Sequence, residues 1–494
     1  MKKNKNDIKY FFIILLLSLI ICSGFIRMHY TTDTYKIIDE GYDNYAKKWS
    51  FKDGRIIMFG LLEICEIINL PIAITNYILT VSAIAISCIA IINIKNIILG
   101  LKDTNNTKEE LLVLILSYLI VFNFMYIEAI YFLEIIVISL SIWLFVLGTK
   151  VIIENKRFYI IKALILVSLG VTAYQGTISF FIAFTFMVLI IKNKKIDSKF
   201  IKKIIAVAFI TLVALVINII VVKISSSYVG LKQNRFNINN IVTNLIYILN
   251  NFDNILLETC GILPKYLYIT ILITEVILSL IYLKMCSENF TQNYIKLMLI
   301  IIITLTACFS VFLATLSSFD CARMYIILGA LPSMVLVYLY VNIQDGKNER
   351  KFIILYFGAI LWLVLNIVTY ILRIEDSRYK NVLEKNYCNN IYNYFIDNNI
   401  TLEKACIIPV KYDANMIYFS ELKTKNKMTI NEIRGYESAI SGFNINIGCK
   451  LEEVKADSEL KEKYMIELKN NCKGINESYS MFIDNTLVMP VFVW

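Results

Sequence analysis

Residues 29–60 read HYTTDTYKIIDEGYDNYAKKWSFKDGRIIMFG and lie between two strongly apolar segments of the chain. Five acidic residues, four tyrosines and a tryptophan are interleaved here, and Arg55 lies near the far end. A simple connection between membrane helices needs only a few polar residues. Acids, aromatic rings and an arginine beside lipid therefore indicate a loop that handles a charged substrate.

The overall composition places this stretch in a polytopic membrane protein. Of 494 residues, 58% are hydrophobic and 18% are charged, and the mean hydropathy is +0.64. Soluble globular chains contain about 45–50% apolar residues. His29 is the sole histidine, so a three-histidine zinc site is excluded, and any catalytic pair that needs a histidine would have to use His29.

The charge distribution argues against a nucleic-acid partner. The net charge is +10, but the segment from Arg373 onward carries 16 Lys/Arg and 17 Asp/Glu, which leaves about +11 for the apolar part. Basic cytoplasmic loops account for that excess, and no basic stripe with base-stacking aromatics is visible. The bias toward Ile, Lys, Asn and Tyr is typical of an A/T-rich bacterial genome.

Apolar runs predict about eleven transmembrane helices in a membrane domain over residues 1–372. The first follows four lysines within residues 2–9 and lacks a good cleavage site, so we expect a retained helix with its N-terminus in the cytoplasm. A short amphipathic helix is expected at 56–69, inside a first outer loop at 27–70. The predicted spans are 10–25, 71–94, 111–125, 130–148, 158–174, 177–191, 203–222, 266–283, 295–316, 324–342 and 352–372.

The charges of the connecting segments support this topology. The five predicted inner loops together carry 18 Lys/Arg, whereas the short outer turns at 126–129 and 175–176 carry none. The first outer loop runs against the rule, with six Lys/Arg from Arg27 to Arg55. Long loops obey the rule weakly.

Residues 373–494 predict a small extracytoplasmic α/β domain. A helix is expected around 377–397 and strands at 404–410 and 480–493. Four cysteines fall here: Cys388, Cys406, Cys449 and Cys472. Two disulfides or four free thiols are both compatible with that number.

In the first outer loop, Asp33 and Arg55 are the leading candidates for chemistry. Asp33 lies a few residues past the first span, where a carboxylate facing a wet cavity can act as a general base. A solvated loop acid is the simpler interpretation for any single acid there. Arg55 at the lipid headgroups suits a phosphate, although an arginine there can also extend to the interface without binding anything.

Three predicted outer turns add further candidates. Glu128 and Glu134 flank the first turn, and an acid below the membrane surface usually faces a polar cavity or a basic partner. Tyr174 and Gln175 occupy the second turn, where tyrosine is often only an interfacial anchor and Gln175 alone is a weak signal for carbohydrate. Arg323, preceded by Asp320, is a second phosphate candidate in the third.

The same residues resemble a known family. The first loop DTYKIIDEGYDNYAKKWSFKDGRI is followed by MYIEAIYFLE, AYQGTISFF and ARMYIILGALP. Their order resembles the Gtr-type membrane glucosyltransferases, which belong to the GT-C type and modify bacterial surface polysaccharide. The likeness covers about residues 8–372.

The resemblance implies inverting transfer of a sugar, most often glucose, from a polyprenyl-phosphate donor to a cell-surface glycan or lipid-linked acceptor. The reaction would take place on the outer face of the bacterial plasma membrane. Asp33 would be the base, with Asp43 as the alternative because Thr32 stands where the family often has a second acid. Arg55 and Arg323 would hold the phosphate. The sugar or acceptor pocket would be lined by Glu128, Glu134, Tyr174 and Gln175.

No metal or other cofactor is expected, because guanidinium groups can stabilise a departing phosphate. Three other classes stay open: a surface-polysaccharide polymerase or ligase, a lipid-linked sugar flippase or transporter, and a structural or sensory protein. A polymerase would usually carry its largest outer loop late in the chain. A transporter would show broken helices near the bilayer midplane and several buried charges.

Overall fold

The computed structural model describes two compact units built from interleaved parts of the chain. The residues described are 6–102, 106–193, 197–231, 240–250, 252–286, 289–310, 322–342, 349–411, 438–470 and 474–493. Unit 1 comprises Met1–Ile26, Ala46–Ile64 and Asn76–Ile371. Unit 2 comprises Arg27–Tyr45, Cys65–Thr75 and Leu372–Trp494.

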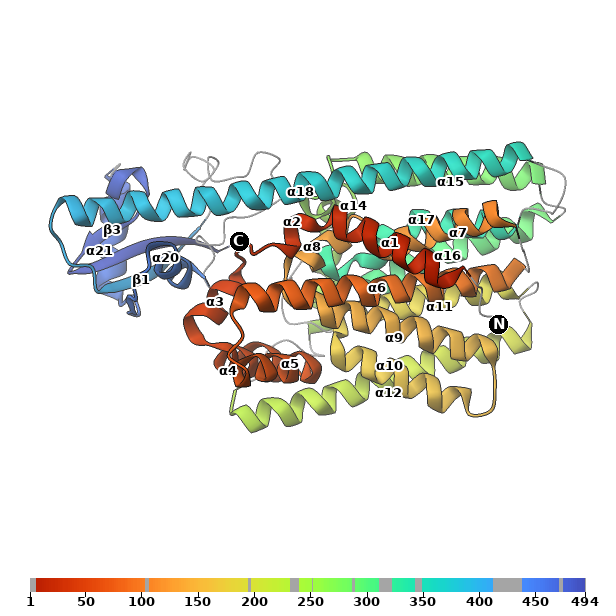
Figure 1. Ribbon diagram of the computed structural model, residues 1–494, viewed down its shortest axis with the longest axis horizontal. Coiled ribbons are helices and arrows are strands. Elements are labelled where there is room, and N and C mark those ends of the chain that lie inside the picture. The colour runs from red at the N-terminus through yellow and green to blue at the C-terminus, as the bar shows by residue number, and fades with distance from the viewer. Residues whose placement is uncertain are drawn as a thin grey trace. The chain divides into compact units, whose positions relative to one another are not determined.

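Unit 1 is helical (Figure 1). Its elements begin with α1 (Asp7–Ile21), α2 (Ser23–Ile26), η1 (Ala46–Phe51), α5 (Ile56–Ile67), α6 (Ile72–Lys102), α7 (Thr107–Val121), α8 (Tyr126–Tyr131), α9 (Ile135–Glu154), α10 (Tyr159–Ala173), η2 (Gln175–Thr177) and α11 (Ile178–Lys192). They continue with α12 (Ser198–Val229), α13 (Ile241–Asn250), α14 (Phe252–Leu256), η4 (Thr259–Gly261), α15 (Leu267–Cys286), α16 (Phe290–Ser310), η6 (Ala322–Met324), α17 (Ile326–Val341) and α18 (Glu349–Asp397). Helices α5, α6 and α18 also contribute residues to unit 2.

Seven helices in the described part of the chain are long and apolar enough to cross a membrane: α6, α9, α11 with η2, α12, α15, α16 and α18. The helical, polytopic architecture expected from the sequence is therefore supported. Each of the eleven predicted spans overlaps a helix in its described part, but α1, α7, α10 and α17 have only 15 or 16 residues. Since a span needs about 20 residues, the number of crossings stays a prediction.

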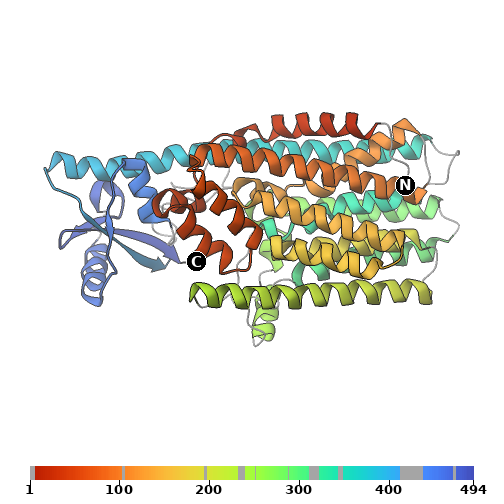
Figure 2. The same ribbon diagram turned by 60° about the horizontal axis from the view of Figure 1, so that its bottom comes forward.

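Small residues let neighbouring helices of unit 1 approach closely. Helices α9, α10 and α12 run side by side, and α11 packs against α9 and α16 (Figures 1 and 2). A Cβ atom on Gly170 of α10 would lie 2.5 Å from the Phe145 ring of α9, and one on Gly148 would lie 3.1 Å from Val167. Close backbone approach of this kind is characteristic of helices packed in lipid.

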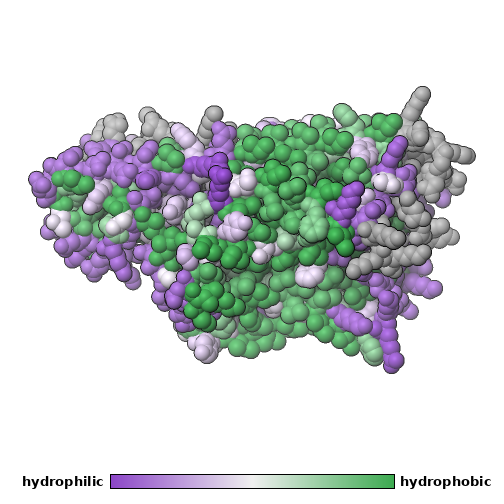
Figure 3. Space-filling view, in the orientation of Figure 1, coloured by the Kyte–Doolittle hydropathy of each residue, from purple (hydrophilic) through white to green (hydrophobic). Residues whose placement is uncertain are grey.

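The outer surface of unit 1 is apolar, as expected for a lipid-facing bundle. The face in Figure 3 shows mainly hydrophobic side chains over its helices. On α12, for example, Ile205, Phe209 and Leu212 are 54–64% exposed. An apolar patch this broad is uncommon on soluble monomers and marks a membrane or protein contact.

Buried polar contacts connect the first helix to its neighbours. Lys95 Nζ of α6 lies 2.6 Å from Asp7 Oδ1 of α1, and Asn96 Nδ2 donates to Asp7 Oδ2 at 2.9 Å. Tyr10 donates a hydrogen bond of 3.2 Å to Glu110 Oε2 of α7. Buried charges need such partners, so these contacts fix α1 against α6 and α7.

Unit 2 combines the first part of the first loop, Arg27–Tyr45, with a mixed four-stranded sheet. Its elements are α3 (Thr32–Glu40), α4 (Tyr42–Tyr45), the end of α18, β1 (Lys404–Lys411), α20 (Ala439–Ile447), β2 (Glu452–Glu453), α21 (Ser458–Lys469), η8 (Ile475–Glu477), β3 (Met481–Ile483) and β4 (Thr486–Val493). The strand order is β2-β1-β4-β3. Strand β1 runs parallel to β2 and β4, with Lys404 opposite Thr486, and β3 is antiparallel to β4.

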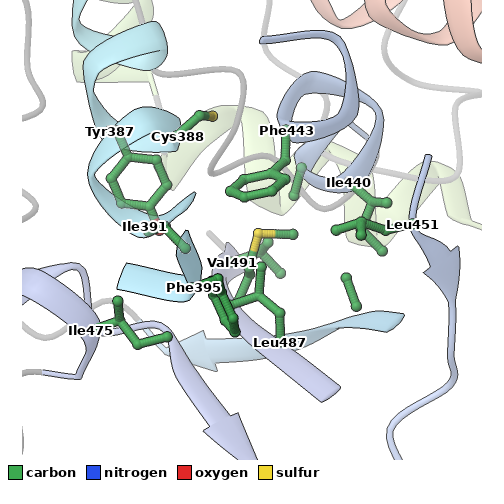
Figure 4. Close-up of a cluster of buried hydrophobic side chains, with 13 residues drawn as sticks. Tyr387, Cys388, Ile391, Phe395, Ile440, Phe443, Leu451, Ile475, Leu487 and Val491 are labelled. Carbon is green, nitrogen blue, oxygen red and sulfur yellow. The ribbon is translucent and has the colours of Figure 1, made fainter. Parts of the chain in front are cut away.

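Alternating side chains of β1 and β4 build a hydrophobic core on each face of this sheet. One core joins the end of α18 and α20 to β4 residues such as Leu487 and Val491 (Figure 4). On the other face, Cys406, Ile408 and Val488 belong to a second core that also includes α21 residues. This is the two-residue period of a strand covered on both sides. The predicted strand at 404–410 is confirmed, whereas the stretch predicted as one strand at 480–493 forms two antiparallel strands, β3 and β4, because the chain turns at Asp484 and Asn485. The predicted helix at 377–397 is the last part of α18.

Three described cysteines of the C-terminal segment form no disulfide. Cys388 lies in the core on one face of the sheet and Cys406 in the core on the other, so these two cannot pair. Cys449 is also free, and Cys472 lies outside the described residues. Of the two interpretations left open by the sequence, the one without disulfides therefore holds for these three.

Candidate functional site

A tight turn places Arg55 at the start of α5. Gly54 has φ +75°, and a Cβ atom there would lie 2.5 Å from Val222 Cγ2 of α12. Glycine adopts this conformation without strain and leaves room for the neighbouring helix. Arg55 follows immediately and is 8% exposed, so its charge is held inside unit 1.

Arg55 is surrounded by groups that stabilise its charge. It pairs with Glu134, which directly precedes α9 and is 4% exposed. Its guanidinium carbon lies 4.9 Å from the centre of the Tyr174 ring. Burial alone would lower the pKa of Arg55, but Glu134, with smaller contributions from Tyr174 and Asp53, raises it. The Nε atom of Arg55 makes no hydrogen bond to any residue that the structure describes.

Arg323 lies in η6 and has a parallel set of contacts. Its Nη1 lies 3.9 Å from Glu128 Oε1, and its backbone N–H donates to Glu128 Oε2 at 3.0 Å. Its guanidinium carbon lies 4.2 Å from the centre of the Phe132 ring. Arginine stacks on aromatic faces in this way, which orients its planar fork of donors.

Tyr174 connects the two arginines. Its ring faces Arg55, and its hydroxyl accepts a hydrogen bond of 3.3 Å from Arg323 Nε. Tyr174 lies in the short connection between α10 and η2, where a Cβ atom on Gly176 would be 2.7 Å from its ring. Gly176 thus leaves the space that the ring occupies.

Gln175 joins the same group through the turn before Arg55. Its Nε2 donates to the backbone carbonyl of Asp53 at 3.5 Å. Its buried Oε1 has no hydrogen-bond partner among the described residues. Buried polar atoms are usually satisfied, so this amide oxygen is a natural contact for a ligand hydroxyl.

The structure therefore brings together six of the residues selected from the sequence. They come from the first loop and three distant turns: Arg55, Glu128, Glu134, Tyr174, Gln175 and Arg323. We call these six residues the arginine cluster.

No family model, curated protein or solved structure matches this chain. The chemical character of the arginine cluster therefore rests on its own residues. Within the described residues, no three His, Cys, Asp or Glu side chains are grouped so as to hold a metal ion.

The two candidate bases lie in unit 2. Asp33 is in the first turn of α3 and Asp43 is in the first turn of α4, and both are partly exposed. An acid in the first turn also interacts favourably with the helix dipole, so a structural reason for Asp33 exists as well. Asp320 lies outside the described residues.

Sequence reasoning missed two members of the neighbourhood. Asp53 is only 1% exposed and contributes to the electrostatics of Arg55, although it looked like a solvated loop acid. The tripeptide Asp53-Gly54-Arg55 predicts a tight turn before an apolar helix. This turn is the feature of the sequence that predicts the proximity of Asp53 to Arg55. Phe132 gave no signal, because one phenylalanine in an apolar run is indistinguishable from a lipid-facing residue.

The arginine cluster can bind an anion with polar substituents. Two guanidinium groups offer forked donors that match phosphate oxygens, and aromatic rings hold the forks in place. The carboxylates of Glu128 and Glu134 balance the charge and can accept hydrogen bonds from hydroxyl groups. A phosphorylated sugar or its lipid carrier combines both features.

Proposed function

We propose that this protein is an inverting membrane glycosyltransferase. It transfers a sugar, with glucose as the first candidate, from a polyprenyl-phosphate carrier to a cell-surface glycan or lipid-linked acceptor. The observation that carries the proposal is the pair of arginines, Arg55 and Arg323, that share Tyr174 inside an apolar helical unit. The apolar surface of unit 1 suits a lipid-linked donor.

The arginines supply what this reaction needs at the leaving group. Negative charge develops on the phosphate oxygens as the bond to the sugar breaks, and fixed guanidinium donors stabilise it without reorganisation. Arg55 and Arg323 take that role, while Glu128, Glu134 and Gln175 bind sugar or acceptor hydroxyls. We propose no metal requirement.

The acceptor side needs a base to remove the hydroxyl proton. We assign this role to Asp33, with Asp43 as the alternative, on the family resemblance and on their position in the first loop. The reaction then takes place on the outer face of the bacterial plasma membrane. The N-terminus is cytoplasmic and the C-terminal domain lies outside in this scheme, which rests on the charge bias of the loops.

Purified protein in lipid nanodiscs, given radiolabelled polyprenyl-phosphate glucose and cell-envelope glycan, tests the proposal. Wild type should transfer label. Arg55→Met and Arg323→Met should reduce transfer at least a hundredfold, and Asp33→Asn should abolish it. Arg157→Met is the matched control, because Arg157 also lies over an aromatic ring, 4.9 Å from the centre of Phe158, but is exposed.

The outcomes separate the candidate classes. Activity that survives Asp33→Asn but not Asp43→Asn moves the base to Asp43. Movement of an intact lipid-linked sugar across the bilayer would identify a flippase, and joining of diphosphate-linked polymers would identify a polymerase or ligase. Folded protein that turns over neither this donor nor a panel of other polyprenyl-phosphate sugars would overturn the proposal.

A further inference from the structure

The first part of the first loop, Arg27–Tyr45, belongs to the same unit as the C-terminal segment. Helix α3 of the loop packs against α20, and both belong to unit 2. Ser441 Oγ of α20 donates a 2.8 Å hydrogen bond to Asp39 Oδ2 of α3. The loop that contains the candidate base is therefore shaped by residues near the other end of the chain.

A buried hydrogen-bond network fixes α3 in this unit. The Tyr35 hydroxyl donates to Glu384 Oε2 of α18 at 3.0 Å and accepts from Asn446 Nδ2 of α20 at 3.1 Å. Lys380 Nζ donates to the Tyr30 carbonyl at 3.0 Å and lies 4.0 Å from Glu384 Oε1. The Tyr30 and Tyr35 rings stack with centroids 5.2 Å apart.

Burying the charged groups of this network costs free energy. We infer that the network serves to fix the geometry of α3 rather than to add stability. Asp376, Lys380 and Glu384 lie one turn apart on α18 and are 0% exposed, as is Tyr35. Well-packed apolar residues would often hold two elements together as strongly as buried charges do. Directional contacts, by contrast, select one register and one rotation of a helix, which apolar packing does loosely.

Tyr35 is suited to act as the donor in this network. Burial, and then the charge of Glu384, raises the pKa of its hydroxyl, so the proton stays on the tyrosine at every physiological pH. Thr31 and Thr34 form a capping box that fixes the start of the helix. Asp33 precedes Tyr35 by two residues, or about 200° of helix rotation, so anchoring Tyr35 directs Asp33 to the opposite side.

We propose that Glu384 is a positioning residue for the first loop. Through its hydrogen bond with Tyr35, Glu384 sets the rotation of α3 and thereby the direction of the Asp33 carboxylate. Asn446 and Lys380 hold α3 further, through their hydrogen bonds to the Tyr35 hydroxyl and the Tyr30 carbonyl. The C-terminal segment thus completes the enzyme, because the base is aligned from α18 and α20. The catalytic part of this inference rests on the proposed function, whereas the anchoring of α3 does not.

Hydrogen–deuterium exchange of full-length protein in lipid tests the anchoring without any substrate. In Glu384→Ala, amides of α3 should exchange at least tenfold faster, while helices of unit 1 keep their rates. Glu384→Gln retains an oxygen that accepts from Tyr35 and should stay near wild type. Lys385→Ala is the matched control, because Lys385 is the adjacent and exposed residue of the same helix.

Kinetics test the consequence. Glu384→Ala should lower kcat for glucose transfer about tenfold or more and leave the KM for the donor unchanged, and Glu384→Gln should restore most of kcat. If Glu384→Ala fails to fold, Tyr35→Phe removes only the hydroxyl and should show the same pattern more weakly.

The two proposals fail in different ways. Wild-type protein without transferase activity, but with α3 released in Glu384→Ala, would overturn the proposed function and leave the anchoring in place. Unchanged α3 exchange in both Glu384→Ala and Tyr35→Phe would overturn the anchoring. Released α3 with an unchanged kcat in an active enzyme would overturn the positioning role.

Discussion

Replacing Glu134 by alanine should destabilise unit 1 strongly. The Arg55 and Glu134 side chains keep only 9% and 5% of their exposure, so the variant leaves a guanidinium buried without its main counter-charge. Removing one partner of a buried ion pair costs about 3–5 kcal/mol. Arg55 keeps its contact with Tyr174 and the charge of Asp53, so we expect a value near the lower end, about 3 kcal/mol.

A thiol-reactive dye can follow this unfolding in detergent micelles. Cys22, Cys88 and Cys308 are 0% exposed in unit 1 and become reactive only when their surroundings open. A urea titration of dye labelling then gives the free energy of unfolding for each variant.

Two further variants separate the ion pair from general damage. The double variant Arg55→Leu/Glu134→Leu removes both charges and should recover stability to within about 1 kcal/mol of wild type, while losing activity. Glu128→Ala should cost less than Glu134→Ala, because Glu128 is 17% exposed and lies 3.9 Å from Arg323. A loss below about 0.5 kcal/mol for Glu134→Ala, or a double variant no more stable than the single one, would refute this reasoning.

Three other outcomes are expected. Arg323→Lys keeps the charge but loses the stack on Phe132 at 4.2 Å, so kcat/KM for the polyprenyl-phosphate donor should fall about tenfold. The control variant Arg157→Lys should have no effect on kcat/KM. Equal losses in the two variants would contradict the assigned role of Arg323. Asn485 has φ +58° in the turn between β3 and β4, so Asn485→Val should cost about 1–2 kcal/mol and Asn485→Gly should be neutral or stabilising, seen as amide exchange of the hairpin. Cys406 is 0% exposed, and burial raises the pKa of its thiol to about 11, so iodoacetamide should modify it negligibly in folded protein at pH 8 and rapidly in protein unfolded by urea, as peptide mass spectrometry would show.

The sequence predicts the arginine cluster because the order and orientation of the predicted membrane spans place its residues on the same side of the membrane. Once the apolar runs are numbered and oriented, Arg55, Glu134, Tyr174 and Arg323 all fall at one predicted face, and the structure places them in contact. The burial of Asp53 is not predicted, because nothing in the sequence distinguishes a buried acid from a solvated acid in a polar loop. The continuity of α18 past residue 372 is not predicted, because the abrupt change in composition there indicates a domain boundary. No proline or glycine follows there before Asp397, so nothing in the backbone chemistry stops the helix.

The sequence also does not predict which segments of the chain assemble into unit 2, for a different reason. Tyr35 and Glu384 are 349 positions apart, and neither lies in a pattern that names a partner. The first loop alternates polar and aromatic residues without a clear period, so its buried face was hidden. The three-dimensional structure is needed to show that Tyr35, with 0% exposure, is one of the buried tyrosines of this loop.

The separation of Tyr35 and Glu384 in the sequence also means that these two residues are synthesised at different times. Ribosomes add about 5–20 residues per second, so roughly 20–70 s pass between synthesis of Tyr35 and synthesis of its partner Glu384. During that interval Tyr35 and Lys36, both buried in the finished unit, are uncovered while the remaining helices are still being made. A ribosome that stops before α20 therefore leaves α3 without its cover. In such a chain the face of α3 that includes Tyr35 and Lys36 is accessible to any protease that encounters it.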